Sequence, residues 1–243
     1  MKPQIGINPW TDMEVEQPWD CVASRYVAEN NKVKNAHDQR FRRMGELIGR
    51  LPAQAEVLNI TSRDGEAADY IMKLYPGTRV TNAEISAGLM AEAARLWPGI
   101  RQVKLHTYSR LPFQDHQFDA IISLETLEHV SEPVSFLSEL YRVCKTGGSL
   151  VLSCPPATSE LPYRLYTSLF GGHGEGPHRF LSSSEVRNLL TTSGWKLIHH
   201  EGTLLLPVGP VWMQNLAEGL IRKLQNTFVS ELGIRQFYVA KRS

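Results

Sequence analysis

The sequence predicts an α/β fold with a doubly wound, Rossmann-like, mainly parallel sheet. Apolar segments of strand length alternate with amphipathic segments of helix length between about residues 55 and 200. Pro-Gly and Gly-Gly pairs separate several of these segments, as turns do. Five strand-helix units in succession favour parallel strands, joined by helices that cover both faces of one sheet.

A helical cap precedes the sheet in this prediction. Residues 1 to about 18 are expected to form an irregular arm, and Trp19 to Leu51 amphipathic helices, because apolar residues recur there among charges. The elements expected next are strand Glu56–Ile60, helix Glu66–Leu74, strand Arg79–Ala83, helix Ala87–Leu96, strand Val103–His106, strand Asp119–Ser123, a helix from Glu132-Pro133, strand Ser149–Cys154, a helix from Ser182 to Gly194, strand Trp195–His200, a helix around Met213–Leu224 and strand Arg235–Ala240.

Local signals place several of these boundaries. Ser131 and Pro133 suit the start of a helix, and the pair Gly147-Gly148 suits its exit. The run Ser182-Ser183-Ser184-Glu185 is a capping-box pattern, which opens a helix.

Size and composition favour one domain. We divide the 243 residues into an N-terminal arm and cap (1–51), a core (52–200) and an inserted helix with the final strand (201–243). The net charge of +1 gives no bulk electrostatic reason to expect nucleic-acid binding. Three widely spaced cysteines without a C-x-x-C pair predict a cytoplasmic location. No apolar run has the length of a signal peptide core or a membrane-spanning helix.

Topology indicates where a ligand would bind. In doubly wound sheets the ligand lies beyond the carboxyl ends of the strands, where the strand order reverses. The segments at those ends are residues 59–65, Glu84, residues 106–110 and residues 123–129.

Two adjoining segments carry a family resemblance. The sequence FDAIISLETLEHV (118–130) followed by FLSELYRVCKTGGSLVLSCPP (136–156) resembles the class I S-adenosylmethionine-dependent methyltransferases, in the type 11 subgroup of ubiquinone-biosynthesis and sugar-modifying enzymes. Residues 111–113, residues 178–181 and the final IRQFYVAKR support the resemblance, which covers roughly residues 55–200. It implies a seven-stranded sheet with an antiparallel last strand, S-adenosylmethionine as cofactor, and methyl transfer as the reaction.

The resemblance implies a set of cofactor-binding residues. Glu84 would accept hydrogen bonds from the ribose hydroxyls, although a Glu there also suits the start of a helix. The loop after the first strand departs from the family pattern of an acidic residue followed by G-x-G-x-G, because Thr and Arg replace two glycines. The full set is Asn59, Thr61, Arg63, Gly65, Glu84, Ile85, Thr107, Tyr108, Ser123, Leu124 and Glu125.

Arg63 has three alternative interpretations. It would bind the carboxylate of the cofactor, fill the space where that group lies, or turn to solvent and bond Asp64. The sequence leaves the three open.

Two histidines are the candidate catalytic residues. His129 is the base candidate if the acceptor is a hydroxyl, and the alternative is that it only caps the turn after the fourth core strand. His178 would orient the acceptor or the glycine-rich loop 171–178, which we expect to form a flexible lip. We expect no metal, since His173, Glu175 and His178 lie on a loop without a helix to fix them.

The predicted function is S-adenosylmethionine-dependent methyl transfer to a small or carrier-bound acceptor, with oxygen slightly favoured as the methylated atom. The alternative is an inactive methyltransferase-like protein that acts as a binding or scaffold partner. Trp19 and Tyr26 would be core residues or an aromatic lid over the cofactor. The helix after Pro210 would wall the acceptor pocket, form the face of a homodimer, or contact a membrane surface peripherally.

Overall fold

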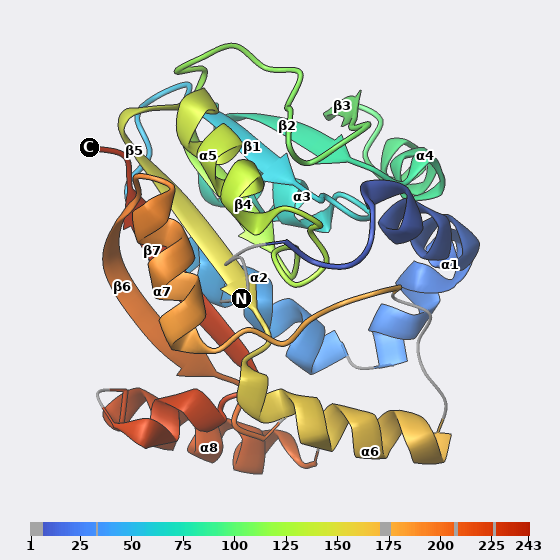
Figure 1. The fold of residues 1–243 in the computed structure, drawn as a ribbon, viewed down its shortest axis with the longest axis vertical. Coiled ribbons are helices and arrows are strands. Elements are labelled where there is room, and N and C mark those ends of the chain that lie inside the picture. Colours follow the sequence, from blue (N-terminus) through green and yellow to red (C-terminus); the bar gives the residue numbers. More distant parts are fainter. Residues whose placement is uncertain (1–6, 33, 171–175, 207–208, 226) are drawn as a thin grey trace.

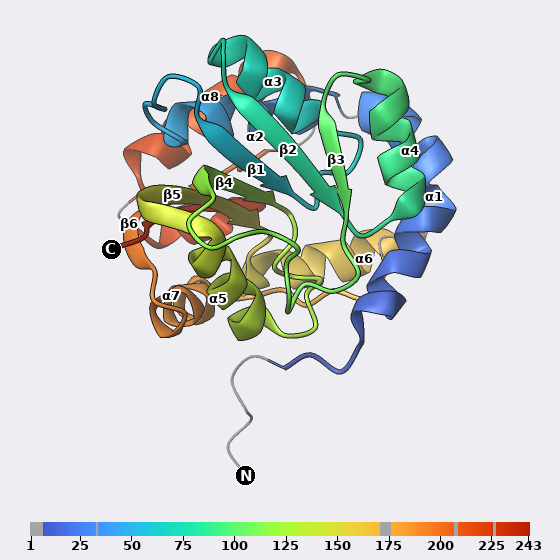
Figure 2. The ribbon, with the colours of Figure 1, turned by 90° about the horizontal axis from the view of Figure 1, so that it is seen from above.

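Seven strands form one sheet in the order β3-β2-β1-β4-β5-β7-β6 (Figures 1 and 2). The computed structural model describes residues 7–32, 34–170, 176–206, 209–225 and 227–243. Strands β1 to β5 pair in parallel, and β7 runs antiparallel to both β5 and β6, as the sequence predicts. The strands are β1 (Glu56–Ile60), β2 (Arg79–Glu84), β3 (Arg101–Lys104), β4 (Phe118–Leu124), β5 (Cys144–Cys154), β6 (Lys196–Thr203) and β7 (Arg235–Lys241).

Helices cover both faces of the sheet. The helices α4, α5 and α7 lie on one face, and α2 and α3 on the other (Figure 2). Helices α6 and α8 lie below the sheet in Figure 1. The helices are α1 (Asp12–Lys32), α2 (Lys34–Leu47), α3 (Glu66–Leu74), α4 (Ala87–Leu96), α5 (Pro133–Val143), α6 (Glu160–Phe170), α7 (Ser183–Thr192) and α8 (Val211–Lys223), with short 3₁₀ turns η1 (Ala157–Ser159) and η2 (Phe228–Leu232).

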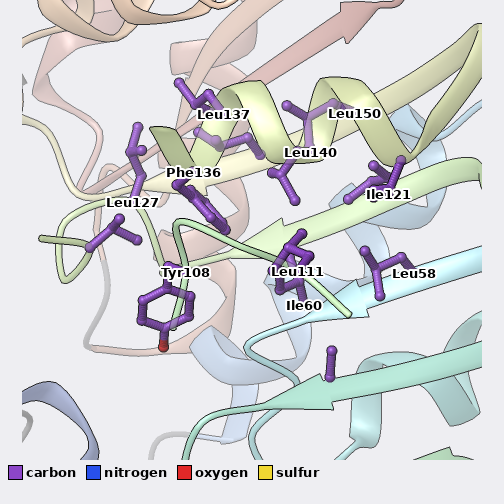
Figure 3. Packing of buried hydrophobic residues seen from close by; sticks show 14 of the residues in the cluster. Leu58, Ile60, Tyr108, Leu111, Ile121, Leu127, Phe136, Leu137, Leu140 and Leu150 are labelled. Atoms are coloured by element: carbon purple, nitrogen blue, oxygen red, sulfur yellow. The ribbon is translucent and has the colours of Figure 1, made fainter. Parts of the chain in front are cut away.

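The core has two layers because strand side chains alternate between the faces. Leu58 and Ile60 point to the cluster that α4, α5 and α7 cover, and Val57 points to the opposite cluster. In the first cluster, Phe136 of α5 contacts Tyr108 edge to face with ring centroids 5.6 Å apart, and Leu137, Leu140 and Leu150 belong to the same cluster (Figure 3). Tyr108 lies at the edge of this group with its hydroxyl directed away from the leucines (Figure 3). The first cluster therefore reaches the carboxyl edge of the sheet through Tyr108.

The first helix begins earlier than predicted. Helix α1 starts at Asp12 rather than Trp19, and Pro18 lies inside it. The reason is a reciprocal cap, since Glu14 Oε2 accepts hydrogen bonds from Thr11 N (2.7 Å) and Thr11 Oγ1, and Glu14 N donates to Thr11 Oγ1. This cap begins the helix upstream of the proline.

Further differences from prediction concern strand β3, strand β5 and helix α6. Strand β3 lies two residues earlier, at Arg101–Lys104, because it pairs with residues 81–84 of β2. Strand β5 starts at Cys144 and includes the glycine pair, because Gly147 N and Gly148 O bond to Arg242 beside the end of β7. Helix α6 was not predicted; Pro162 falls in its first turn, where a proline is tolerated. Among the described residues, no helix is long and apolar enough to cross a bilayer.

Candidate active site

The loop after β1 keeps a glycine-like backbone although two glycines are absent. Thr61, Arg63 and Gly65 occupy the three glycine positions of the G-x-G-x-G pattern, and their φ angles are 55°, 53° and 81°. A left-handed conformation costs a residue other than glycine about 1–2 kcal/mol. Only Gly65 is sterically required, because a Cβ there would lie 2.8 Å from Asn82 Nδ2. The loop therefore combines left-handed φ angles, which suit glycine, with two side chains that glycine lacks.

Glu84 closes the carboxyl end of β2. Its Oε2 accepts a hydrogen bond from Arg63 N (2.7 Å), and its Oε1 accepts bonds from Ile85 N (2.8 Å) and Ser86 N (3.0 Å). The carboxylate is fully buried, and three backbone donors stabilise its charge. Glu84 thus ties the loop after β1 to the turn that starts α4.

Asp12 takes part in the loop after β3, which sequence reasoning did not foresee. Its Oδ2 accepts hydrogen bonds from Thr107 Oγ1 (2.7 Å) and Tyr108 N (2.8 Å), and its Oδ1 accepts one from Ser131 Oγ (2.7 Å). Burial raises the pKa of Tyr108 well above its usual range. The N-terminal arm thereby supplies an acidic group that the loop itself lacks.

The loop after β4 contributes to a partly buried ion pair. Glu125 Oε1 lies 3.0 Å from Arg235 Nε and also accepts a hydrogen bond from Ser153 Oγ (2.7 Å). Arg235 Nη1 donates to Gln39 Oε1 of α2 (3.2 Å). The pair connects the carboxyl ends of β4 and β5 to the helical cap, and no local pattern in the sequence marks Arg235 as a member of it.

Arg63 lies inside the site rather than in solvent. Only 6% of its surface is exposed, its Cζ lies 3.5 Å from the centroid of the Trp19 ring, and its Nη2 donates to Glu125 O (3.3 Å). The solvent-facing interpretation with an Asp64 partner is therefore wrong. Trp19 is itself buried and also contacts Tyr26 and His129 edge to face, at centroid distances of 6.1 and 5.6 Å.

The two candidate catalytic histidines lie together. The ring centroids of His129 and His178 are 5.9 Å apart, and His129 Nδ1 bonds Pro177 O at 2.9 Å. Burial, followed by the charge of Arg63, lowers the pKa of His129 to about 3, so its imidazole is neutral at pH 7. His178 also contacts Tyr163 and Phe180. His173 and Glu175, with most of the predicted lip, lie outside the described residues.

The site contains buried polar atoms that lack partners among the described residues. They belong to the side chains of the β1 loop, its neighbouring strands and α1, and buried polar groups are otherwise nearly always bonded. Such atoms suit a polar ligand with several hydrogen-bonding groups, so the residues present fit a nucleoside cofactor. The atoms are Trp19 Nε1, Ser62 Oγ, Arg63 Nη1, Asn82 Nδ2 and Ser123 Oγ.

The remaining predicted residues line the same edge. Asn59 Nδ2 donates to Asn82 Oδ1 (2.8 Å), a partner that the sequence did not indicate. Ile85 and Leu124 are buried beside Glu84 and Glu125 in the chain. The structure thus gathers residues of four separate loops at the carboxyl ends of β1 to β4.

A second cavity lies between α2 and α8. It has a volume of about 330 Å³, and Gln39, the partner of Arg235, is one of its lining residues. Most of its other lining groups are polar, among them Asn35, Arg42, Gln214, Asn215 and Glu218. The opposite face of α8 is apolar and open, with Trp212 and Leu216 exposed by 66% and 68%.

A family model described as "Methyltransferase domain" matches residues 58–152. The chain is similar to the ubiquinone/menaquinone biosynthesis C-methyltransferase UbiE of Desulfotalea psychrophila, with 27% identity over 82% of this chain and 89% of that protein. It is 33% identical to a demethylmenaquinone methyltransferase of Beutenbergia cavernae, over 65% of this chain and 66% of that protein. This second alignment therefore spans just under two thirds of the relative.

Solved structures share the fold. The [4+2]-cyclase SpnF has a TM-score of 0.70 at 18% identity, covering 99% of both chains. An S-adenosylmethionine-dependent methyltransferase of Thermotoga maritima has a TM-score of 0.64 at 19% identity, covering 93% of this chain and all of that one. Since one of the two is named a cyclase, the fold alone does not determine the reaction.

Proposed function

We propose, since this chain belongs to the class I S-adenosylmethionine-dependent methyltransferases, that it transfers a methyl group to a ring carbon of a quinone-type acceptor. S-adenosylmethionine is its cofactor. The carbon and the acceptor class follow the names of the relatives, a C-methyltransferase and demethylmenaquinone methyltransferases. The observation that carries the proposal is the cluster of Glu84, Arg63, Ser123 and Glu125 at adjacent carboxyl strand ends.

The cofactor, when bound, supplies an electrophilic methyl group. Glu84 would hold the ribose through its buried carboxylate, and Ile85 would flank the adenine. The backbone of residues 61–65 would contact the amino-acid part, and Ser123 and Leu124 would lie beneath the ligand. Thr107 and Tyr108, fixed by Asp12, would border the adenine.

His129 is a weak base in this site. A general base works best when its pKa lies near the operating pH, and the pKa of His129 is about 3. Methylation of a ring carbon, like that of a hydroxyl, releases one proton, which passes to solvent because His129 is a poor base for either acceptor. The proposal of carbon, in place of the oxygen expected from the sequence, therefore rests on the names of the relatives. We assign His129 and His178 to positioning the acceptor. The polar cavity between α2 and α8 offers amide and guanidinium groups for the oxygens of a quinone-type ring.

The test is a methylation assay with the full chain. Methyl-labelled S-adenosylmethionine is incubated with a reduced demethylmenaquinone-type naphthoquinol, and the product is located by mass spectrometry. We expect label on the ring carbon, and none with a control acceptor whose carbon is already methylated. Label on oxygen contradicts carbon transfer. Cofactor binding without transfer to any acceptor would support the inactive scaffold alternative.

The exposed apolar face of α8 has its own proposal. Trp212, Leu216 and Leu220 lie at spacing of four on the helix, with Arg222 and Lys223 at its C-terminal end. An apolar stripe beside basic residues suits the headgroup region of a membrane, so we propose peripheral membrane contact rather than a homodimer. A cytoplasmic location remains our proposal from the cysteine content.

A further inference from the structure

The guanidinium of Arg63 connects the loop after β1 to two other elements of the cofactor site. The residue itself belongs to the loop after β1, its Cζ lies over the ring of Trp19 in α1, and its Nη2 bonds Glu125 O after β4. Its backbone N is fixed to Glu84 Oε2. The side chain therefore bridges the space between the cap and the sheet edge, which is where a ligand of this site would lie.

Burial shows that protein atoms fill this space. Arg63 is 6% exposed, and Trp19, Glu84, Tyr108 and His129 are each 4% exposed or less. These side chains therefore cover one another. A ligand that touches Glu84 and Ser123 must first displace some of them.

Arg63 is weakly held for a buried cation. Its side chain makes no ion pair with any carboxylate of the described residues, its Nη1 is buried without a partner, and its one hydrogen bond is long at 3.3 Å. Arg235, in contrast, has its carboxylate partner Glu125 at 3.0 Å. A buried guanidinium without a counter-ion is costly, and the stacking contact with Trp19 is the main interaction that retains it.

We propose that Arg63 is a gate: its side chain closes the cofactor site of the free protein and must leave before the cofactor binds. The proposal rests on the cofactor assignment of the proposed function. Because binding requires the open state, the apparent dissociation constant equals the intrinsic one divided by the open fraction. Arg63 thus weakens cofactor binding and sets the concentration at which the enzyme becomes loaded.

Calorimetric titration of the full chain with S-adenosylmethionine and S-adenosylhomocysteine tests the gate. We expect Arg63→Ala to bind both ligands about tenfold more tightly than the natural chain, the factor that loss of one desolvated stacking contact would give. Arg63→Lys keeps the charge but loses the planar contact, and should give a smaller gain. The control is Arg95→Ala, an exposed arginine of α4 whose loss should leave binding unchanged.

A second measurement needs no ligand. Acrylamide quenching of tryptophan fluorescence should increase in Arg63→Ala, because Trp19 loses the group that covers its ring, and Trp19→Phe should abolish the difference. Increased quenching together with tighter binding supports the gate.

Weaker binding in Arg63→Ala overturns the gate and makes Arg63 a ligand of the cofactor carboxylate. Unchanged binding also overturns the gate. In that case the methylation assay can still succeed, so failure of the gate is distinguishable from failure of the proposed function. If neither protein binds, Arg63 is not the obstacle and the gate also fails. If the gate stands while no acceptor is methylated, only the proposed function fails.

Discussion

The Oδ1 atom of Asp20 accepts a hydrogen bond from the hydroxyl of Ser86 at 2.6 Å. The same oxygen accepts one from Gly88 N at 3.0 Å. Ser86 is the N-cap of α4, so a carboxylate of α1 lies at the positive end of the α4 dipole. Helices α1 and α4 approach each other closely at Gly88, where a Cβ would lie 2.9 Å from Ala23 Cβ. Helix α1 of the helical cap is thus attached to α4, the helix that follows Glu84.

We expect Asp20→Ala to lower the free energy of unfolding by about 2 kcal/mol, since two hydrogen bonds to a carboxylate are lost. Urea denaturation checks the value. Asp38→Ala, which removes only an exposed pair with Lys34, should cost less than about 0.5 kcal/mol. Equal losses in the two variants would contradict the attachment of α1 by Asp20.

Thr61→Gly should stabilise the protein by about 1 kcal/mol, because a β-branched residue is strained at a φ of 55° and glycine is not. The measurement is the midpoint of urea unfolding at a constant slope. Thr81→Gly is the matched control, because Thr81 lies in the extended strand β2 and its loss should destabilise. A destabilised Thr61→Gly would show that contacts of the Thr61 side chain outweigh the strain.

Stability should fall as the pH is lowered from about 6.5 towards 3, in part through His129. The folded pKa of about 3 lies below the ordinary value of 6.5, so the unfolded chain binds one more proton in this window. This contributes at most about 1.4 kcal/mol per pH unit. In urea unfolding at pH 7.5, 6 and 5, His129→Gln should show a shallower decline than the natural chain. His116→Gln, at an exposed position, should retain the full decline.

The apolar face of α8 should bind vesicles that contain anionic lipid. Co-sedimentation of the full chain with phosphatidylglycerol vesicles is expected, and the double variant Trp212→Ser/Leu216→Ser should lose most of it, since both side chains are exposed. Asn215→Ser, on the same helix, should bind as the natural chain does. If light scattering instead shows a dimer that the double variant disrupts, the face is an interface between two copies.

The sheet was predictable because its central strands β1 and β4 are short, largely buried and bounded by turn residues, and because strand and helix segments alternate along the chain. The capping box at Ser182 predicted the start of α7, and Pro133 predicted the start of α5, because both signals act through local chemistry. Helix α1 begins at Asp12, before the predicted start at Trp19, because the Thr11 and Glu14 cap starts it upstream of Pro18, and a proline is a local signal against a helix interior. Local signals therefore set most elements, and they mislead where two of them conflict.

The positions of the site followed from topology, but its contacts did not. Glu84 and Arg63 could be placed at strand ends from the chain order alone. Asp12 and Arg235 come from the first and last elements of the chain, and no local pattern marks them as neighbours of the same edge. Whether Arg63 faces solvent or Trp19 depends on how α1 packs, a tertiary contact that the loop sequence does not contain.

The left-handed backbone at positions 61 and 63 has a consequence for engineering. A glycine at either position would adopt the φ angle already present, so a fully glycine-rich loop requires no movement of the main chain. The side-chain volume at positions 61 and 63 can then be varied to adjust ligand affinity while the backbone of the loop stays the same. Position 63 suits a graded series of variants, from arginine through lysine and alanine to glycine. Each variant then differs in its side chain and not in the conformation of the backbone.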